Sequence, residues 1–383
     1  MAKEIKYGMV GGSLEAFIGE VHRKAIGFDT RVELVCGCFS SREEKNRLTA
    51  EAYGIAPERT YADYKAMAAA EAARPDGIDF VSVTTPNNTH YDICKAFLEA
   101  GIHVVCDKPL CFEVSEAEEL VKLAEEKDLV FGVTYTYTGY TMVKVAREMI
   151  LSGKLGEIVA VNAEYVQDWL LDELSAENRG KQKNDAVWRT DPAKSGISNS
   201  VGDIGTHMEN MISYLTGLKI KRLLSTVNTY GRALDLNSNI IVEYENGVNG
   251  GYWCSQVAAG KLNGLIARVY GTEGAIEWEQ HYPDYLKYTP KGGAVQILSR
   301  GTGYITEAAG AASRLPGGHP EGMYVAFANI YRNVVSTIIK KKAGLAPDPA
   351  DLDFPSVREG LEGVKFVHAV ISSAKADSSW IDM

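Results

Sequence analysis

An acid and an imidazole lie four residues apart near the middle of the sequence, at Asp203 and His207. Apolar residues follow at helical spacing and Gly217 is typical of a C-terminal stop, so the sequence predicts a helix that begins here. On that helix the two side chains share one face, away from the apolar stripe. A carboxylate beside a histidine can orient a base that loses and regains a proton near neutral pH. A buried, hydrogen-bonded structural histidine fits the same short run, so the pair alone leaves both interpretations open.

A glycine-rich turn follows the first expected strand, beginning at Gly11 and Gly12 and ending at Gly19. Glycines in such a turn let the backbone approach a pyrophosphate, while the start of the next helix, at Phe17 and Ile18, faces the negative charge. The spacing departs from G-x-G-x-x-G, because about three extra residues precede the last glycine. Glycine pairs after strands are common, so it is the position of this turn after a first strand that favours a dinucleotide site.

Polar residues follow two further expected strands at their carboxyl ends, where the ligands of a parallel sheet bind. An ordinary turn and a solvated loop would explain these residues as well. A lysine at such a strand end, however, can hydrogen-bond both a substrate hydroxyl and a nicotinamide ribose. The candidates for cofactor contact from these two strand ends are Thr85, Pro86, Asn87, His90, Asp107 and Lys108.

The end of the second expected strand decides between NAD and NADP, because an acid there accepts the ribose 2′-hydroxyl and repels a 2′-phosphate. This sequence has Ser40, Ser41 and Arg42 at that position and no acid. Ser40 and Arg42 can hold a phosphate, which favours NADP. Arg42 can equally begin a helix or stack on adenine, so NAD and NADP both remain open.

A polar, irregular stretch and its surroundings offer candidates for substrate contact. Aromatic faces beside hydrogen-bonding groups suit a polyhydroxylated ring, whose CH face stacks while its hydroxyls are bound individually. Tyrosine and tryptophan more often pack in a core than bind a ligand, so packing is the alternative for each aromatic residue. The preferred candidates are Tyr137, Trp188, Arg189 and His319.

Composition limits the classes of partner. The chain has 383 residues, which suits two domains, and 45% hydrophobic and 23% charged residues are typical of a globular protein. A formal net charge of -10 disfavours a nucleic-acid partner, and no apolar run reaches the ~20 residues of a membrane span. The first residues lack the apolar core of a signal peptide. We therefore expect neither nucleic acid nor membrane as a partner.

Six cysteines are scattered through the sequence, mostly in apolar, strand-like contexts. This usage is typical of reduced, buried thiols in a cytoplasmic protein. Cys36 and Cys38 lie two residues apart and would point to opposite faces of a strand, so we expect no metal site there.

The first third of the sequence alternates short apolar runs with helical patterns. The expected strands cover 4–10, 32–39, 78–83, 102–106 and 129–133, and the expected helices cover 17–27, 42–53, 90–100 and 115–127. The last of these helices has Ser115 as its N-cap, with Glu118 three residues later. The alternation predicts right-handed crossovers and a parallel sheet covered by helices on both faces, as in a Rossmann dinucleotide-binding domain.

The pattern changes after residue 135, where strands follow one another without intervening helices. Strands are expected at 157–165, 240–244, 248–254, 268–270 and 275–278, and helices at 142–152, 323–342 and 356–376, with a surface excursion at 292–318. Asn246-Gly247 is a strong hairpin signal because it accepts positive φ. We expect an α/β fold with a Rossmann domain over 1–134 and an α+β domain over 135–383, whose open sheet is mainly antiparallel.

Taken together, these motifs make the sequence resemble the Gfo/Idh/MocA family of sugar and inositol oxidoreductases over nearly its whole length. Four segments carry the resemblance: the glycine turn with Gly19 and His22, Thr85-Pro86-Asn87 with His90, Asp107-Lys108-Pro109, and Gly202 to His207. Each is weak alone, and their order and spacing make them specific. Two departures are the lengthened glycine loop and Asp107 in place of the family's glutamate, which leaves the role of Asp107 less certain.

The resemblance implies that the second domain carries the substrate and forms a homo-oligomer, a dimer or tetramer, and that Lys108, Asp203 and His207 are catalytic. We expect an NAD(P)-dependent dehydrogenase that oxidises or reduces a secondary alcohol of a sugar, glycoside or inositol. His207 would be the general base, and Lys108 would polarise the reacting oxygen. The resemblance also allows an NAD-dependent glycoside hydrolase that acts by transient C3 oxidation, elimination and re-reduction. A non-catalytic sensor is a third interpretation, which the retained catalytic set disfavours.

Overall fold

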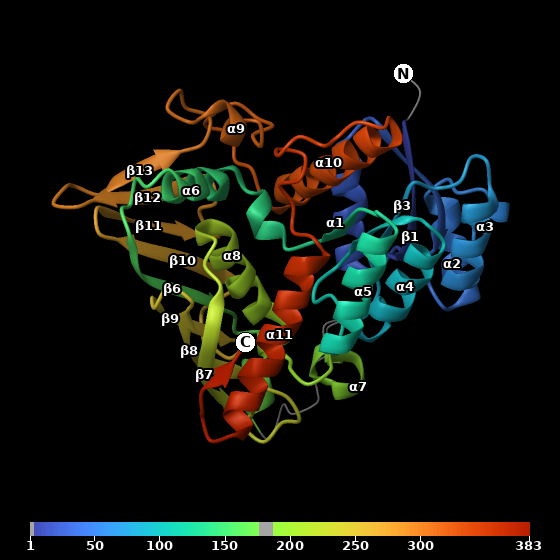
Figure 1. Ribbon diagram of the computed structural model, residues 1–383. Helices are drawn as coiled ribbons and strands as arrows, with labels where there is room; N and C mark the ends of the chain where they lie inside the picture. The colour runs from blue at the N-terminus through green and yellow to red at the C-terminus, as the bar shows by residue number, and fades with distance from the viewer. Residues whose placement is uncertain (1–3, 176–186) are drawn as a thin grey trace. The chain divides into compact units, whose positions relative to one another are not determined.

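The chain forms two units, as the computed structural model of residues 4–175 and 187–383 shows (Figure 1). Unit 1 comprises Met1–Gly139 and Met323–Leu361, and unit 2 comprises Tyr140–Gly322 and Glu362–Met383. A boundary at residue 134 would leave residues 323–361 in the second domain. They belong instead with unit 1, because the helix that they begin buries its apolar side chains in the core of that unit.

Unit 1 contains a five-stranded sheet in the order β2-β1-β3-β4-β5. Its strands are β1 (Ile5–Gly11), β2 (Val32–Cys38), β3 (Phe80–Thr84), β4 (His103–Cys106) and β5 (Phe131–Val133). Every pairing between neighbours is parallel, so the carboxyl ends of all five strands lie at one edge. The predicted parallel, Rossmann-type sheet is thereby confirmed.

Helices connect these strands and cover the sheet. They are α1 (Phe17–Ile26), α2 (Glu43–Ala52), α3 (Tyr64–Ala73), α4 (His90–Glu99), α5 (Val114–Glu126) and α10 (Met323–Lys342), with short 3₁₀ turns at Pro57–Arg59, Asn87–Thr89 and Thr136–Gly139. No element is predicted for the alanine-rich segment that forms α3. Asp63 starts this helix, because its carboxylate accepts hydrogen bonds of 2.9 Å from the main-chain N–H groups of Lys65 and Ala66.

The N-cap of α5 lies two residues before the predicted one. The helix begins at Val114, so Ser115 lies inside it instead of serving as the N-cap. Glu113 occupies the N-cap position, and the Glu116 side chain accepts a hydrogen bond of 3.1 Å from the Glu113 main-chain N–H. Both Ser115-x-x-Glu118 and Glu113-x-x-Glu116 have an acid three residues after the cap, so local spacing alone chose the wrong one.

Helix α10 completes the core of unit 1 although it is more than 300 residues from β1 in the sequence. Its residues Phe327, Tyr331 and Val334 are buried in the same cluster as Ile5 of β1 and Phe80 of β3. Burying side chains of this size stabilises a fold by about 1.5–3 kcal/mol each. Unit 1 therefore depends on a segment that follows unit 2 along the chain.

Unit 2 contains a nine-stranded sheet in the order β13-β12-β11-β10-β6-β9-β8-β7-β14. Its strands are β6 (Ile158–Val166), β7 (Ile220–Asn228), β8 (Asn237–Tyr244), β9 (Asn249–Ser255), β10 (Gly264–Gly271), β11 (Gly274–Glu279), β12 (Tyr285–Pro290), β13 (Gln296–Ser299) and β14 (Ile381–Asp382). Only β6 and β9 pair in parallel, which confirms the predicted, mainly antiparallel sheet. The predicted hairpin joins β8 and β9, where Gly247 has a φ of +84°.

Helices α6 (Thr141–Leu151) and α8 (Thr206–Thr216) lie on one face of this sheet in Figure 1. The other helical segments are α7 (Pro192–Ser195), α9 (Glu307–Gly310) and α11 (Val357–Lys375), with 3₁₀ turns at Leu171–Leu174 and Val187–Thr190. The expected surface excursion at 292–318 is partly ordered into β13 and α9. Its glycine and alanine content concealed both elements, because these residues give little periodic signal.

All six cysteines are free and buried, in agreement with the predicted reduced thiols. Among the helices that the structure describes, none combines the length and the apolar character needed to cross a membrane.

A half-buried histidine in β4, His103, makes the stability of unit 1 depend on pH. The Nδ1 atom of His103 accepts a hydrogen bond of 2.9 Å from the Val130 main-chain N–H, which requires a neutral ring. Burial, and then the charge of Lys341, lower the pKa of His103 to about 4. A lowered folded-state pKa contributes stability above the unfolded-state value, and that stability is lost as the pH falls toward the folded-state value.

We therefore expect His103→Asn, which keeps an acceptor but cannot titrate, to flatten the acid side of the stability profile. Between about pH 7 and pH 4, the free energy of unfolding of the wild type should fall by about 3 kcal/mol more than that of the variant. Urea denaturation at several pH values measures both. Parallel profiles for the two proteins would contradict the prediction.

Candidate active site

The glycine turn after β1 forms a cradle that only glycine permits. Gly11 and Gly12 have φ values of +84° and +74°, in the left-handed region that favours glycine. A Cβ on Gly19 would lie 2.2 Å from the Cα of Gly12, so the first turn of α1 and the loop touch directly. Ala16, the N-cap residue of α1, has no side chain that caps the helix. Free main-chain N–H groups at a helix start beside Cβ-free backbone fit the pyrophosphate of a dinucleotide.

The extra residues of the glycine loop form an ordered turn. The Ala16 main-chain N–H donates to the Ser13 carbonyl oxygen at 2.8 Å. The Leu14 N–H reaches the Thr49 hydroxyl of α2 at 3.4 Å, and the Tyr53 hydroxyl donates to the Gly12 carbonyl at 3.2 Å. The longer loop is therefore tied to α2 and leaves the contact of Gly12 with α1 intact. Phe17 is exposed and Ile18 half-buried at the start of the helix.

The end of β2 carries the predicted Ser40, Ser41 and Arg42, which are half-buried or exposed. The Arg42 main-chain N–H donates to the Ser40 hydroxyl at 3.2 Å, and Arg42 is the N-cap residue of α2. Residues 39–42 after the strand contain no acid, although the Glu15 carboxylate lies close enough to Arg42 for the two charges to attract each other. This arrangement accommodates either a ribose hydroxyl or a 2′-phosphate.

His90 joins the loops that follow β3 and β4. Its Nε2 atom lies 2.9 Å from the Thr85 carbonyl oxygen, and its Nδ1 atom lies 2.9 Å from the Pro109 carbonyl oxygen. The ring is completely buried; burial lowers the pKa of His90, while its two carbonyl acceptors act in the opposite direction. Pro86 and Asn87, between the two contacts, are exposed and half-buried. The ring therefore lies behind the two loops and holds them, while Thr85–Asn87 and Lys108 supply their surface.

Asp107 is bound to a buried polar chain that the sequence does not reveal. Its Oδ1 atom accepts a hydrogen bond of 2.8 Å from the Thr134 hydroxyl and lies 3.7 Å from Nε2 of His22. Nδ1 of His22 lies 2.6 Å from the Tyr331 hydroxyl, which in turn lies 2.8 Å from the Ser82 hydroxyl. Tyr331 belongs to α10, so no local pattern connects it with Asp107.

This environment keeps Asp107 ionised. Burial favours the protonated acid, but the neighbouring His22 and Lys108 outweigh burial and lower the pKa of the Asp107 carboxyl. An aspartate is one methylene shorter than the glutamate of the resembling family, and 3.7 Å exceeds a hydrogen bond. The Asp107 carboxylate and Nε2 of His22 therefore face each other at more than ordinary hydrogen-bond length. Lys108 follows Asp107 directly, is half-buried, and joins Pro109 through a cis peptide bond.

In unit 2, Asp203 lies in a π-helical turn, Val201–Gly205, that precedes α8. The Thr206 main-chain N–H bonds to the Val201 carbonyl five residues earlier, which widens the helix at this point. His207 lies in the first turn of α8, is 7% exposed, and has its ring 5.9 Å from that of Tyr165. The predicted helix exists and ends at Gly217 as expected, but its first turn is not α-helical. Single π turns are frequent at functional sites.

Asp203 also contacts one of the expected substrate residues. The Nε atom of Arg189 donates to Oδ1 of Asp203 at 3.1 Å, and the Arg189 guanidinium lies 4.8 Å from the Trp188 ring. Arg189 therefore lies beside the Asp203 carboxylate within unit 2, and Trp188 lies against the Arg189 guanidinium. Gln256, which the sequence did not single out, donates from Nε2 to Oδ2 of Asp203 at 2.9 Å.

The other two substrate candidates belong to different units. Tyr137 lies in the 3₁₀ turn Thr136–Gly139 of unit 1 and is 9% exposed. His319 lies in unit 2 on an exposed segment before α10. Their contact with a substrate remains an expectation.

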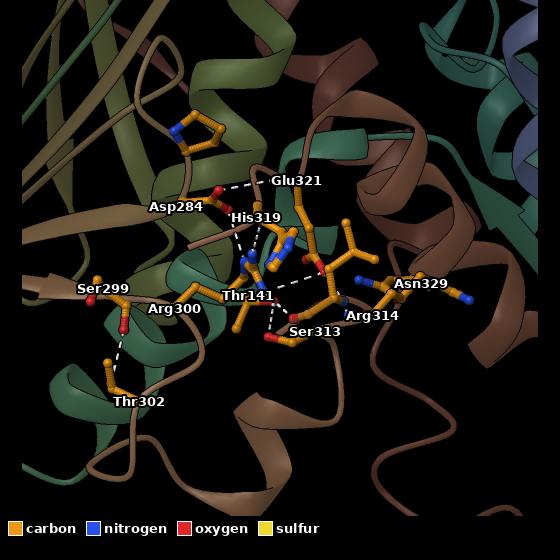
Figure 2. Close-up of polar contacts among 12 residues, drawn as sticks. Thr141, Asp284, Ser299, Arg300, Thr302, Ser313, Arg314, His319, Glu321 and Asn329 are labelled. Carbon is orange, nitrogen blue, oxygen red and sulfur yellow. Dashed lines mark hydrogen bonds and ion pairs between the residues drawn. The ribbon is translucent and has the colours of Figure 1, made fainter. Parts of the chain in front are cut away.

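Arg300 holds the segment that carries His319, as Figure 2 shows. This arginine is buried, and its Nε donates to Asp284 at 3.0 Å while its terminal nitrogens donate to the main-chain carbonyls of Leu315 and His319. Glu321 accepts hydrogen bonds of 2.6 Å from the main-chain N–H groups of Arg314 and Leu315. A buried ion cluster thus fixes the backbone of this segment and leaves the His319 side chain exposed.

Comparison with known proteins matches both units. Residues 5–135 match a family model described as an oxidoreductase family with an NAD-binding Rossmann fold, and residues 143–277 match the GFO/IDH/MocA C-terminal domain. The uncharacterised oxidoreductase YfiI of Bacillus subtilis is 36% identical, over 100% of this chain and 98% of that protein.

Relatives of stated activity are also similar. An inositol dehydrogenase homolog from Azotobacter vinelandii, solved with NAD+, is 37% identical with a TM-score of 0.93, covering 100% of this chain and 98% of that chain. The homolog solved with NADH and myo-inositol has a TM-score of 0.90 at 36% identity, with the same coverage. Levoglucosan dehydrogenase of Pseudarthrobacter phenanthrenivorans is 28% identical over 56% of this chain and 58% of that protein.

The contact between Gly12 and Gly19 gives a direct test of the cradle. We expect Gly19→Ala to weaken dinucleotide binding by roughly tenfold or more, about 1.4 kcal/mol, because the new methyl group would separate the loop from α1. Calorimetric titration with NADH and NADPH measures this. Gly303→Ala is the matched control, since a Cβ there meets no atom within 4 Å. An unchanged affinity in Gly19→Ala would contradict the assignment of the cradle.

Proposed function

This chain belongs to the Gfo/Idh/MocA family of oxidoreductases, and from that membership we propose that it is a dehydrogenase acting on a secondary alcohol of a sugar, glycoside or inositol. The observation that carries the proposal is that one chain holds both a Cβ-free dinucleotide cradle, in unit 1, and Asp203 with His207, at the start of α8 in unit 2. The full-length similarity to a homolog that binds NADH and myo-inositol supports a polyhydroxylated substrate.

Unit 1 is an NAD-binding Rossmann domain, and the bound nicotinamide supplies the carbon that accepts or returns a hydride. We propose that Gly11, Gly12 and the first residues of α1 hold its pyrophosphate. The loops after β3 and β4, which His90 ties together, would then present Thr85–Asn87 and Lys108 to the nicotinamide ribose. The ionised Asp107 would keep the Lys108 loop in one position.

Removal of a proton from the reacting hydroxyl is assigned to the chain's own residues. His207 takes this proton as general base, since an imidazole titrates near neutral pH. Lys108 donates a hydrogen bond from Nζ to the same oxygen and stabilises its negative charge. We propose that Asp203 binds a substrate hydroxyl while Arg189 donates to Oδ1 and Gln256 donates to Oδ2, since each carboxylate oxygen can accept more than one hydrogen bond.

We also propose that the chain assembles as a homo-oligomer, a dimer or tetramer, through the face of the nine-stranded sheet opposite α6 and α8. That face exposes large apolar side chains from several strands. Burying them against a second copy of the chain would remove apolar surface from water, which is favourable. The exposed residues concerned are Ile241, Tyr270, Tyr285 and Ile297.

The catalytic assignment predicts that His207→Ala and Lys108→Ala each lower kcat by about 100-fold or more, because general base catalysis and oxyanion stabilisation are lost. Cofactor affinity should persist in His207→Ala. The assay follows NAD(P)H absorbance with a panel of sugars, inositols and aryl glycosides while measuring aglycone release. His281→Ala and Lys127→Ala are matched controls, since both side chains are exposed.

Two results would contradict the proposal. Unchanged kcat in either variant on a turned-over substrate would remove that residue from the catalytic set. Release of aglycone without accumulation of NADH would replace net oxidation by redox-neutral glycoside cleavage.

The guanidinium at the end of β2 yields a separate prediction about the cofactor. We expect Arg42→Ala to raise the Kd for NADPH by roughly tenfold while leaving the Kd for NADH within about twofold, because only NADPH carries the 2′-phosphate. Arg47→Ala on the same helix is the control, since its exposed side chain pairs with Glu51. Equal losses for both cofactors would show that Arg42 contacts the adenine or ribose they share.

A further inference from the structure

The Asp203 carboxylate is held at both of its oxygen atoms by side chains from outside its own helix. Arg189 donates to Oδ1 at 3.1 Å, and Gln256, which directly follows β9, donates to Oδ2 at 2.9 Å. The second hydrogen of the Gln256 amide points to Oε1 of Gln167 at 3.3 Å. Gln256 is fully buried, so this amide has no water to exchange with. Burying an amide costs free energy unless its hydrogen bonds are made. The partners of Gln256 at both ends of its amide therefore indicate a specific role for this side chain.

A chain of donors fixes which end of the Gln256 amide faces Asp203. The Asp235 main-chain carbonyl can only accept, so the Asn199 side-chain atom 3.1 Å from it must be the amide nitrogen Nδ2. The same nitrogen donates to the Gln256 oxygen at 2.7 Å. Once its oxygen is engaged in this way, Gln256 must present its nitrogen to Asp203. The direction of the hydrogen bonds is therefore determined from a backbone carbonyl to the carboxylate.

Asp235 anchors the start of this chain. Its carboxylate accepts hydrogen bonds of 2.8 Å from the main-chain N–H groups of Asn199 and Val201, immediately before and at the start of the π turn. Burial raises the pKa of Asp235, while these N–H groups act in the opposite direction. The acid thus secures the backbone from which both Asn199 and Asp203 extend.

We propose that Gln256 is a positioning residue that keeps Asp203 as an ionised acceptor with one fixed orientation, and this rests on the proposed function of Asp203. An amide N–H stabilises a carboxylate but repels the O–H of a carboxylic acid, so Gln256 opposes protonation of Asp203. Asp203 then accepts a hydrogen bond from a substrate hydroxyl and donates none. The proton that leaves the reacting hydroxyl is directed to His207 instead.

The titratable groups around Asp203 in the described part of unit 2 define the background against which Gln256 acts. Arg189 faces Oδ1, and His207 lies four residues along the helix. The further groups on the packed elements are Asp235 through Asn199, Cys254 of β9 and Tyr165 of β6. Gln256 donates to Oδ2 at 2.9 Å, so its replacement tests the proton state on that side of the carboxylate.

The decisive experiment replaces the neutral amide by an acid of the same shape. In Gln256→Glu, two carboxylates would stand about 2.9 Å apart in a buried site and share a proton. We expect the acid limb of the kcat profile to move up by about one pH unit or more, with activity recovering at higher pH. Gln256→Leu, which removes the donor without adding a charge, should lower kcat by about tenfold and move the acid limb in the same direction by a smaller amount, while changing KM less.

Gln280→Glu is the matched control, because this half-buried glutamine accepts a hydrogen bond from the Leu265 main-chain N–H and its replacement still can. Its pH profile should coincide with that of the wild type. A Gln256→Glu profile that coincides with both would overturn the inference, whereas loss of activity in Asp203→Asn alone would leave the proposed function standing.

A second measurement needs no turnover. The free energy of unfolding of Gln256→Glu should fall, relative to wild type, between pH 5 and pH 8, because a carboxyl whose folded-state pKa is raised loses stability as the pH rises. Adding Asp203→Asn should restore at least a tenfold difference in the folding equilibrium constant at pH 8, about 1.4 kcal/mol. Purely additive effects would show that Gln256 does not hold Asp203, even if no tested alcohol is oxidised. Coupling without any alcohol oxidation would instead reject the proposed function alone.

Discussion

A carboxylate that leaves bulk water must receive hydrogen bonds or a cation, and this requirement organises both units of the protein. In unit 1, the Asp107 carboxylate accepts a hydrogen bond from the Thr134 hydroxyl and lies 3.7 Å from Nε2 of His22. In unit 2, Asp235 receives two main-chain N–H groups, and Asp203 receives a guanidinium and an amide. Each acid lies beside a segment that carries reactive groups. The hydrogen bonds to these carboxylates therefore also hold the neighbouring segments in a single backbone arrangement. Acid–base catalysis requires reactive groups to be positioned in this way.

Backbone constraints act with these charges in unit 1. The approach of Gly12 to Gly19 sets the distance between a strand end and a helix start, where main-chain N–H groups attract anions. His90 sets the relation between the next two strand ends through two carbonyl oxygens. Since the sheet is parallel, all of these loops lie at one edge. The loops that follow β1, β2, β3 and β4 thereby form one surface. The backbone positions their binding groups, so no long side chain has to reach across the sheet.

Unit 2 separates a fixed charge from a titrating group. Arg189 and Gln256 donate to the Asp203 carboxylate, whereas His207 is the group that we propose takes the proton. The π turn between them lets the main chain widen where the two side chains emerge. The amide chain from Asp235 to Gln256 contains no titrating link after its first member. A proton therefore has one acceptor in this proposal, and the direction of its transfer follows from the surrounding donors.

The sequence alone determined the parallel sheet, the antiparallel sheet, the hairpin at Gly247 and the candidate residues at strand ends, because period, turn chemistry and glycine requirements are local properties. It misjudged the cap of α5, gave no signal for α3 and put α10 in the wrong unit. Only the tertiary structure brought Tyr331 to His22 and Gln256 to Asp203, pairs 309 and 53 residues apart. Such pairs produce no periodic pattern in the sequence. A buried polar group needs only one hydrogen-bond partner in the right place, and that partner can come from any part of the chain.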